Sequence, residues 1–489
     1  MATPLPIFDE REGPRDECGV FGIYAPGHEV ARLAYFGLYA LQHRGQESAG
    51  IASAGGDGYI ITQRALGLVS QVFKEHDLRA LGGDLAIGHV RYSTTGSNEW
   101  ENSQPIHRSA GMGGNRRELA LAHNGNLINA VELHASLREQ GIGFSSTSDS
   151  EIIAALLATH PAETMDEAIA DVVPRLQGAY STVVMTKDRV YAFRDPAGVR
   201  PLVLGKLEDR WCVASESCAL DIIGAEYLRE VRPGECVSFG AEGFTSEMIV
   251  EGARPAFCVF EHIYFARPDS RVRDTVLQVI RGRMGEILAR EAPVPSADLV
   301  IAVPDSGSTA ARGFARASGL LQDDGFVKNR YVARTFIQPG QELRKHGLRL
   351  KFNPLPEIVA GRRLVVVDDS IVRGNTTRQI VEMLRSAGAL EVHLRISAPP
   401  VRHPCHYGID MHTREEMIAH GRTVDEIAQE LGADSVAYLS LAGVYEAIGA
   451  PREQHCDACF SGEYPLEGTE EAQGKFAFEA VLPMAAPGS

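Results

Sequence analysis

Two adjacent carboxylates follow a hydrophobic run in the second half of the chain. The run, 364–367, consists of branched apolar residues, which is typical of a strand buried on both faces of a parallel sheet, and Asp368 and Asp369 come directly after it. The residues that lead from there into a helical pattern are small or polar: Ser370, Arg373, Gly374, Asn375, Thr376 and Thr377. A strand, a polar turn and a helix N-terminus form a cradle for phosphate. Carboxylates beside it suit sugar hydroxyls or Mg²⁺.

An ordinary strand–turn–helix unit with a polar loop is the alternative, because this stretch has neither GxxxxGK[ST] nor GxGxxG. The letters LVVVDDSIVRGNTT closely resemble the phosphoribosyl pyrophosphate (PRPP) motif of type I phosphoribosyltransferases. This resemblance implies that Asp368 and Asp369 bind the ribose diol of PRPP and, with Ser306, position Mg²⁺. It also implies that residues 370–377 hold the 5-phosphate.

A second set of reactive residues begins at Cys18, directly after a polar, unpatterned leader. Removal of residues 1–17 would expose an α-amino group with a pKa of about 7.7, which can act as the base for the thiol of the same residue. The alternative is a buried strand cysteine. The segments that accompany Cys18 are HRGQES (43–48), GHVRYSTTG (88–96), HNGNL (123–127) and TSDSE (147–151). The Asn-Gly pair of HNGNL predicts a tight turn.

In combination and in this order, these segments resemble the class II glutamine amidotransferase domain, which has an N-terminal-nucleophile hydrolase fold. The resemblance implies that Cys18 attacks the glutamine amide and that Asn124 and Gly125 form the oxyanion hole. It also implies that Arg91 and Asp149 hold the α-carboxylate and α-amino groups of glutamine. A strand-edge salt bridge for Arg91 and a helix cap for Asp149 are the alternatives.

The segment 328–351 is basic within an acidic chain, with seven Lys or Arg residues against the single acid Glu342. Its Pro-Gly break and weak periodicity predict a mobile loop, which would suit closure over pyrophosphate. A solvated surface loop is the alternative. KNRYVARTF and PGQ resemble the flexible loop of amidophosphoribosyltransferases, so Lys328 and Arg334 are expected to bind PRPP.

Four of the eight cysteines are candidate metal ligands. Cys456 and Cys459 have CxxC spacing, which fits zinc, a cluster or a redox pair, and Cys258 and Cys405 are the candidate partners, with Cys236 as a competitor. The flanking letters resemble the cluster-bearing branch of amidophosphoribosyltransferases, which implies a structural [4Fe–4S] cluster on four thiolates. Zinc is the second candidate. The cysteines at 212, 218 and 236 lie in strand-like stretches and are interpreted as small buried hydrophobes.

The elements that must position these residues divide the chain in two. From about residue 171 the pattern is rich in short strands, which predicts a sheet-on-sheet core. From Pro255, CVFEHIYFARPDS predicts a strand, and DLVIAVPDSGSTAARGFARASG predicts a further strand and helix. We therefore expect a propeptide at 1–17 and an αββα sandwich of the Ntn-hydrolase class at 18–250. A type I phosphoribosyltransferase α/β domain with a parallel sheet follows at 251–465, with a poorly ordered tail at 466–489.

Composition limits the function. The chain has 489 residues, 44% hydrophobic and 23% charged, and a net charge of −16, which argues against a general nucleic-acid partner. No run of about 18 apolar residues predicts a membrane span, and the acidic N-terminus lacks the apolar core of a secretory signal. A cytoplasmic location is expected.

The resemblance extends from Cys18 to Cys459 and implies an amidophosphoribosyltransferase of purine synthesis. Such an enzyme converts glutamine, PRPP and water into 5-phosphoribosylamine, glutamate and pyrophosphate, and passes ammonia between two sites. One Mg²⁺ and one [4Fe–4S] cluster per subunit, inhibition by purine nucleotides, and a homotetramer or homodimer are implied. The alternatives are another class II amidotransferase, which should lack the PRPP motif, and a non-catalytic PRPP sensor, which would not need the Cys18 set.

Overall fold

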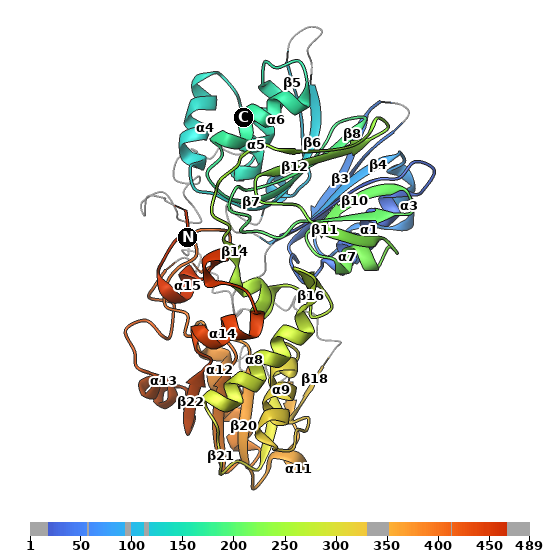
Figure 1. Ribbon diagram of the computed structural model, residues 1–489. Helices are drawn as coiled ribbons and strands as arrows, with labels where there is room; N and C mark the ends of the chain where they lie inside the picture. The colour runs from blue at the N-terminus through green and yellow to red at the C-terminus, as the bar shows by residue number, and fades with distance from the viewer. Residues whose placement is uncertain are drawn as a thin grey trace, which may run out of the picture.

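The structure is a computed structural model that describes residues 18–55, 58–92, 99–111, 117–329, 352–411 and 413–466. Residues 1–17, Arg334, most of the basic loop and nearly all of the expected tail lie outside these ranges. Figure 1 shows two stacked parts, which we call the N-terminal part (18–250) and the C-terminal part (251–466).

Two antiparallel sheets packed face to face form the centre of the N-terminal part. In the described residues their strand orders are β11-β9-β10-β1-β4-β2-β3 and β13-β12-β8-β7-β6-β5. The strands of the first sheet are β1 (Gly19–Tyr24), β2 (Ser48–Ala54), β3 (Ile60–Leu66), β4 (Leu85–Arg91), β9 (Val203–Leu207), β10 (Arg210–Ala214) and β11 (Glu226–Glu230). The strands of the second are β5 (Ile106–Ala110), β6 (Arg117–Leu127), β7 (Gly178–Met185), β8 (Arg189–Arg194), β12 (Glu235–Gly240) and β13 (Gly243–Met248).

Helices cover the outer faces of both sheets. Alternation along β1 shows the layering, because Phe21 and Ile23 pack with the helices while Val20 packs in the core between the sheets. The first sheet carries α1 (Val30–Ala40), α2 (Val69–Val72), α3 (Glu75–Ala80) and α7 (Cys218–Asp221). The second carries α4 (Ala130–Glu139), α5 (Asp149–Thr159), α6 (Met165–Val172) and η3 (Val173–Arg175), and η1 (Trp100–Asn102) precedes β5. The predicted αββα sandwich is confirmed.

The C-terminal part is built on a parallel sheet with the order β17-β20-β21-β22 in the described chain. In β20, Leu364 and Val366 pack against one helix layer and Val365 and Val367 against the other, so the predicted strand with two buried faces is confirmed. The main elements are β17 (Leu299–Ala302), β20 (Arg363–Asp368), β21 (Glu391–Ile396), β22 (Ser435–Tyr438), α8 (Leu277–Glu291), α9 (Ser308–Ser318), α12 (Asn375–Ser386), α13 (Val424–Leu431) and α14 (Leu441–Ile448).

Shorter elements surround this sheet, and the segment from β14 (Phe257–Cys258) to the start of η4 (Glu261–Phe265) connects the two parts. The other shorter elements are β23 (His455–Cys456), β15 (Arg271–Val272), β16 (Thr275–Val276), β18 (Phe326–Lys328), β19 (Phe352–Pro354), α11 (Pro356–Val359), η5 (Arg452–Gln454) and α15 (Ala458–Ser461). Phe257 of β14 and Phe260, just before η4, share one hydrophobic cluster with Ala197 and Val199 of the N-terminal part. The two parts therefore meet through a continuous core.

Three local predictions are wrong. HNGNL is not a turn but the end of β6, because its residues pair with β7 as far as Leu127 and the ladder overrides the local preference of Asn-Gly. The segment after Cys258 is not a strand: β14 ends there and the π-helix η4 follows, which allows Phe260, Ile263 and Phe265 to be buried together. Cys218 begins the helix α7.

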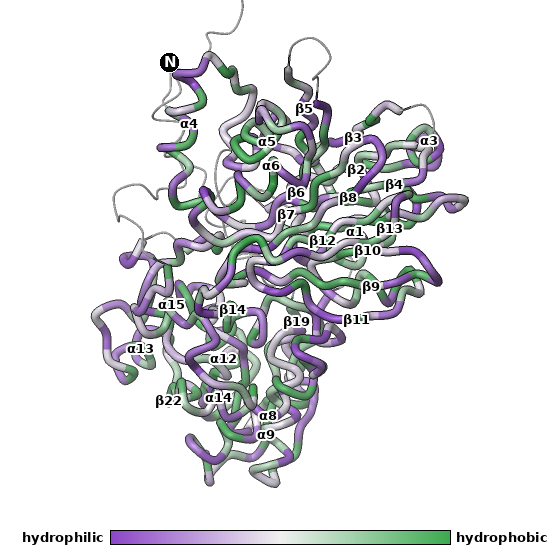
Figure 2. The backbone as a smooth tube through the Cα atoms, turned by 45° about the horizontal axis from the view of Figure 1, so that its top comes forward, coloured by the Kyte–Doolittle hydropathy of each residue, from purple (hydrophilic) through white to green (hydrophobic). Residues whose placement is uncertain are grey.

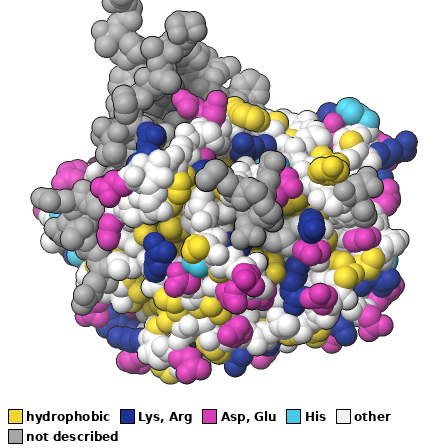
Figure 3. Space-filling view, turned by 90° about the horizontal axis from the view of Figure 1, so that it is seen from above, with side chains coloured by type: hydrophobic (Ala, Val, Ile, Leu, Met, Phe, Trp, Pro, Cys, Tyr) yellow, Lys and Arg dark blue, Asp and Glu magenta, His cyan; other side chains and the backbone are white. Residues whose placement is uncertain are grey.

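Hydrophobic and hydrophilic residues are mixed along the helices of both parts in Figure 2. None of the helices in the described chain is long and apolar enough to cross a membrane. On the face seen in Figure 3, Lys and Arg side chains are interspersed with Asp and Glu.

Candidate functional site

The Cys18 thiol is buried at the start of β1. The residue is 6% exposed, and its Sγ donates a hydrogen bond to the backbone oxygen of Tyr92 at 3.3 Å. β1 runs between β4 and β10, so the thiol lies near the end of β4. Burial raises the pKa of the thiol to about 11, although the charge of Arg91 acts in the opposite direction. The thiol of this chain is therefore protonated at neutral pH, and a base is needed to activate it.

One cation, Arg91, and two carboxylates, those of Glu47 and Asp149, act on this thiol. Arg91 is the last residue of β4, and its Nη1 is 3.9 Å from a carboxylate oxygen of Glu47. Asp149 is the first residue of α5, and the charges of Arg91 and Asp149 both influence Cys18. The N-cap of α5 is Ser148, whose side chain accepts a hydrogen bond from the helix. Since the cap is supplied by Ser148, the Asp149 carboxylate has other partners.

Asn124 and Gly125 lie in β6, which Asp149 holds in place by accepting a hydrogen bond from the Leu127 N–H at 3.0 Å. Asn124 is 2% exposed, and its Nδ2 has no hydrogen-bond partner among the described residues. A Cβ at Gly125 would lie 1.9 Å from the Ala179 oxygen, and φ is +145°, so only glycine fits there. A buried N–H that is left unpaired is the type of donor that an oxyanion hole requires.

Three further residues of this pocket were not indicated by the sequence: Glu47, Tyr92 and His123. All three lie within the quoted polar segments, so the unusual polarity of those segments was the available signal. His123 Nδ1 is 3.1 Å from Ser150 Oγ and 3.7 Å from the Asp149 carboxylate. Burial lowers the pKa of His123, which keeps the imidazole neutral.

The two predicted carboxylates stand at the carboxyl end of β20 and are buried. The Asp369 N–H donates to Asp368 Oδ1 at 2.9 Å, Ser306 Oγ donates to Asp368 Oδ1 at 3.4 Å, and the Ser370 hydroxyl donates to Asp369. Burial raises the pKa of Asp368 and of Asp369, and the proximity of the two charges raises that of Asp368 further. A cation or a set of hydroxyl donors would stabilise both ionised forms.

Arg281 is a further residue that the sequence did not indicate. It is a buried arginine of α8, its charge acts on Asp369, and burial lowers its pKa to about 10. Its guanidinium donates to the backbone oxygens of His262 at 2.9 Å, Glu261 at 3.4 Å and Ala266 at 2.7 Å. Arg281 thus connects the carboxylate pair with η4.

The polar turn after β20 leads into α12, as predicted. Gly374 is the N-cap of α12 with φ +84°, and Asn375, Thr376 and Thr377 form the first turn of that helix. The N-terminus of a helix of twelve residues offers N–H donors and a positive dipole end to a phosphate. Arg373 forms an ion pair with Glu416 at 2.6 Å, so its guanidinium is already engaged.

Lys328 is the last residue of β18, and its ammonium group pairs with the Asp305 carboxylate. Asp305 follows β17, directly before Ser306. Lys328 therefore lies at the edge of the sheet where the carboxylate pair stands. Arg334 is outside the described residues.

The four candidate ligand cysteines come together from three segments of the C-terminal part. Cys258 of β14 and Cys456 of β23 are directly paired strand residues. The backbone oxygen of Cys459 accepts N–H bonds from residues 402 and 403 at 2.9 and 3.1 Å, which brings the Cys405 segment alongside. Electrostatic interactions link Cys258, Cys456 and Cys459 with Cys405. We call these four residues the cysteine group.

The four thiols of the cysteine group are the type of donor that either a zinc ion or an iron–sulfur cluster takes. No three His, Cys, Asp or Glu side chains in the described ranges converge closely enough to hold a single metal ion. Tetrahedral zinc requires four ligands about 2–2.3 Å from one ion, and an iron–sulfur cluster is held by Cys thiolates. The competing ligand Cys236 is buried with the helices on the second sheet of the N-terminal part. Mg²⁺ is likewise compatible, because it usually takes only one or two carboxylates and keeps water and phosphate ligands.

A buried ion network joins the two parts near HRGQES. Arg44 is 1% exposed and pairs with Glu216 of the N-terminal part and with Glu261 of η4. Burial opposes the charge of Arg44, but the two carboxylates raise its pKa above the usual range. Glu216 also accepts a bond from the Ser270 hydroxyl at 2.6 Å. This network fixes the segment before Glu47 against the C-terminal part.

Known proteins resemble this chain over both parts. A family model for the glutamine amidotransferase domain matches residues 89–221. The amidophosphoribosyltransferase of Mycobacterium tuberculosis (strain ATCC 25618 / H37Rv) is 49% identical over 488 residues, which cover 97% of this chain and 92% of that protein.

Two solved structures agree with this similarity. A structure of the allosteric regulatory enzyme of purine biosynthesis has a TM-score of 0.87 and 46% identity, and the match covers 93% of this chain and 97% of that chain. The glutamine PRPP amidotransferase from B. subtilis, complexed with ADP and GMP, has a TM-score of 0.87 and 44% identity, with 93% and 98% covered.

These similarities extend over both parts of the chain, so they exclude an amidotransferase with a different second half. The chain belongs to the amidophosphoribosyltransferase family, the pentosyltransferases of purine biosynthesis that carry a glutamine amidotransferase domain.

Proposed function

We propose that the chain forms 5-phosphoribosylamine in two half-reactions at two sites. In the first, glutamine and water give glutamate and ammonia at Cys18. In the second, ammonia displaces pyrophosphate from C1 of PRPP at the edge of the parallel sheet. The observation that carries the proposal is the buried Cys18 thiol, on which the charges of Arg91, Glu47 and Asp149 act, in a chain that also carries the Asp368–Asp369 pair.

In the first half-reaction Cys18 Sγ attacks the side-chain amide carbon of glutamine, and a thioester forms as ammonia leaves. Asn124 Nδ2 and the Gly125 N–H donate to the oxyanion of the tetrahedral intermediate. Arg91 binds the α-carboxylate of glutamine and Asp149 its α-amino group. Water then hydrolyses the thioester, which releases glutamate and restores the thiol.

Removal of residues 1–17 belongs to this proposal. While Cys18 is linked to Glu17, its nitrogen is an amide and cannot accept a proton. A free α-amino group would take the thiol proton and deliver it to the departing ammonia. This explains how a thiol whose pKa is raised by burial can become a nucleophile at neutral pH.

In the second half-reaction Asp368 and Asp369 bind the ribose diol, and residues 370–377 at the start of α12 bind the 5-phosphate. Lys328 and Arg334 bind the pyrophosphate group. When bound, one Mg²⁺ held by Asp368, Asp369 and Ser306 would neutralise charge on the leaving pyrophosphate. The buried carboxylates also favour the positive charge that develops on the ribose as the bond to pyrophosphate breaks.

We also propose the division of the chain into an amidotransferase domain at 18–250 and a phosphoribosyltransferase domain at 251–465. Ammonia would pass between them inside the protein, which is supported by the hydrophobic cluster shared by the two parts. The cysteine group would hold one [4Fe–4S] cluster that ties three distant segments together.

Further proposals concern partners. Purine nucleotides are proposed as inhibitors, supported by the relative that was solved with ADP and GMP, and a homotetramer or homodimer as the assembly. A cytoplasmic location is supported by the eight cysteines, none of which forms a disulfide.

The test uses Cys18→Ala with Cys212→Ala as its matched control, because Cys212 is also buried in the first sheet. For each protein, one assay measures glutamate release with and without PRPP. A second assay measures phosphoribosylamine formation from glutamine and from ammonium. Cys18→Ala should lose all use of glutamine and keep the use of ammonium, and the control should keep both. Glutamine use by Cys18→Ala would refute the proposal. A visible spectrum of the same samples tests the cluster, since a colourless active protein would refute it.

A further inference from the structure

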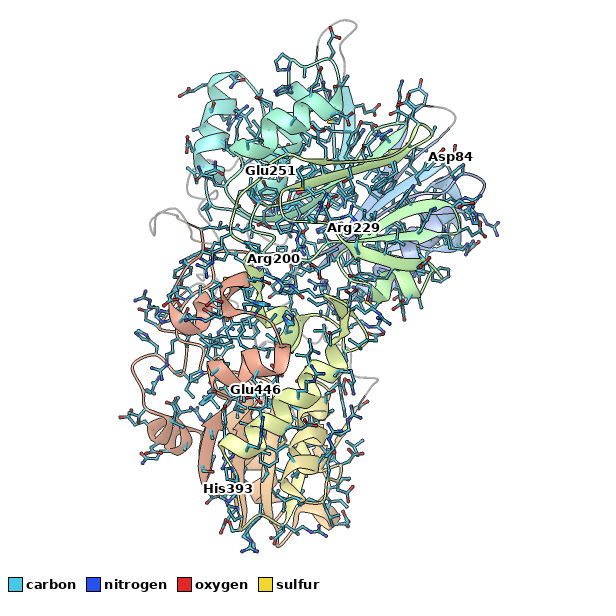
Figure 4. The ribbon with its side chains drawn as sticks, in the orientation of Figure 1. Asp84, Arg200, Arg229, Glu251, His393 and Glu446 are labelled. Carbon is cyan, nitrogen blue, oxygen red and sulfur yellow. The ribbon has the colours of Figure 1, made fainter. Side chains whose placement is uncertain are left out.

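Arg200 is a fully buried arginine at the junction of the two parts, as its label in Figure 4 shows. Its Nε donates to the backbone oxygen of Tyr407 at 2.8 Å, and Nη2 donates to the same oxygen. Its own backbone oxygen accepts from Arg194 Nε at 2.6 Å and from Ser181 Oγ at 3.2 Å. The N-terminal part thus fixes the arginine, and the arginine holds one carbonyl of the C-terminal part.

Tyr407 lies between this arginine and the cysteine group. Its N–H donates to Cys405 Sγ at 3.4 Å, so one residue links the guanidinium to a candidate ligand. The Cys258 N–H donates to the backbone oxygen of Val199, the residue before Arg200, at 3.1 Å.

The same segment contacts the strand that carries the oxyanion donors. A Cβ placed on Gly408 would be 3.2 Å from the Gly125 carbonyl carbon and 3.4 Å from Arg200 Nη2. Asn126 Nδ2 donates to the backbone oxygen of His406 at 3.1 Å. Residues 405–408, which we call the bridging segment, therefore contact the cysteine group at one end and β6 at the other.

We infer that Arg200 is a positioning residue that holds the bridging segment against Asn124–Gly125 and offsets the negative charge of the cysteine group. This inference rests on the proposed cluster and glutaminase site. Four thiolates give an iron–sulfur cluster a net negative charge, and a buried charge is costly unless a partner offsets it. Hydrogen bonds to cluster sulfurs and nearby charge also set the reduction potential, so Arg200 acts on both sites through Tyr407.

The test compares Arg200→Gln and Arg200→Lys, with Arg395→Lys as the matched control. Arg395 is a buried arginine that donates to backbone oxygens, among them that of Ala292 at 2.7 Å, but it lies in β21. For each protein we would measure the iron content and the midpoint potential of the cluster. The activity assays give kcat and KM for glutamine hydrolysis and the rate of synthesis from ammonium.

Arg200→Gln should shift the midpoint potential to more negative values and lower the glutaminase kcat at least about tenfold, with synthesis from ammonium within about twofold of wild type. Arg200→Lys should retain the potential but recover only part of kcat, because an ammonium group does not reproduce the two N–H donors. The Arg395 control should change neither quantity.

Gly408→Ala provides a second test if Arg200→Gln does not fold. It should lower the glutaminase kcat while iron content and potential stay as in wild type, since φ is +102° at Gly408 and the strained alanine places its methyl group against Gly125. If wild type contains iron but a folded Arg200→Gln keeps wild-type potential and kcat, the inference is overturned while the proposed function stands. The same holds if Arg200→Gln does not fold and Gly408→Ala keeps wild-type kcat. Wild type without iron would instead overturn the proposed cluster, and with it the charge-offset role of Arg200.

Discussion

Replacement of Asn124 by leucine should separate catalysis from stability. Asn124 Nδ2 is buried and has no partner among the described residues. Loss of one oxyanion-hole donor lowers kcat by about 100- to 1,000-fold, which corresponds to about 2.7–4 kcal/mol of transition-state stabilisation. We therefore expect Asn124→Leu to reduce glutamine hydrolysis by that factor with little change in KM.

Stability should respond in the opposite sense. A buried polar group without a hydrogen bond destabilises a folded protein by about 1–3 kcal/mol, and leucine has a similar size and no polar group. The melting temperature of Asn124→Leu should therefore equal or exceed that of wild type. Thermal unfolding and the synthesis of phosphoribosylamine from ammonium provide the controls, and synthesis from ammonium should be retained.

One result would refute this reasoning. If Asn124→Leu lowered the melting temperature and kept the wild-type kcat for glutamine, Nδ2 would have a structural partner and no role in the oxyanion hole. Gly143→Ala is the matched control for substitution in this part of the chain, because a Cβ there meets nothing within 4 Å. It should change neither kcat nor melting temperature.

Three further predictions follow from burial and charge. With the leader attached, the rate of Cys18 alkylation by iodoacetamide should increase with pH up to about pH 11. Burial raises the thiol pKa to about 11, and the reactive thiolate becomes more populated as the pH rises. A rate that reached its plateau near pH 7 would contradict this. Asp369→Asn should reduce synthesis from ammonium by about 10- to 150-fold, because a hydrogen bond to a charged group contributes about 1.5–3 kcal/mol. Basal glutamate release without PRPP should be unchanged. Arg44→Met should destabilise the fold by about 3–5 kcal/mol, because Glu216 and Glu261 lose their buried partner; an unchanged melting temperature would show that other groups compensate the two carboxylates.

Sequence patterns predicted the strand, turn and helix around Asp368 and Asp369 well because these elements are local. In β20 and α12, a hydrophobic run, two carboxylates, a glycine turn and a helical pattern follow one another along the chain, and each has a local physical cause. The position of Asp368 and Asp369 at the end of a parallel strand follows directly from that order.

Local sequence patterns gave wrong predictions where pairing with a distant segment decides the backbone conformation. Asn124-Gly125 has the composition of a turn, yet β6 continues through it, because β7 supplies a partner for each residue and glycine tolerates φ +145° beside Ala179. The aromatic residues after Cys258 fit a strand equally well until the shared core of the two parts is known. Arg44 and Glu261 are 217 residues apart, and no local pattern indicates such a pair.

The junction of the two parts shows why polar contacts are needed in addition to an apolar core. Hydrophobic burial is nondirectional, so the cluster around Phe257 and Val199 can hold the parts together without fixing their relative orientation. Arg44 with Glu261 and Arg200 with Tyr407 are directional, and each places a buried cation of the N-terminal part against an acceptor of the C-terminal part. Two such points, separated along both parts, resist rotation of one part on the other. The proposed transfer of ammonia between two sites would require that fixed orientation, which gives a reason for burying arginines at the junction.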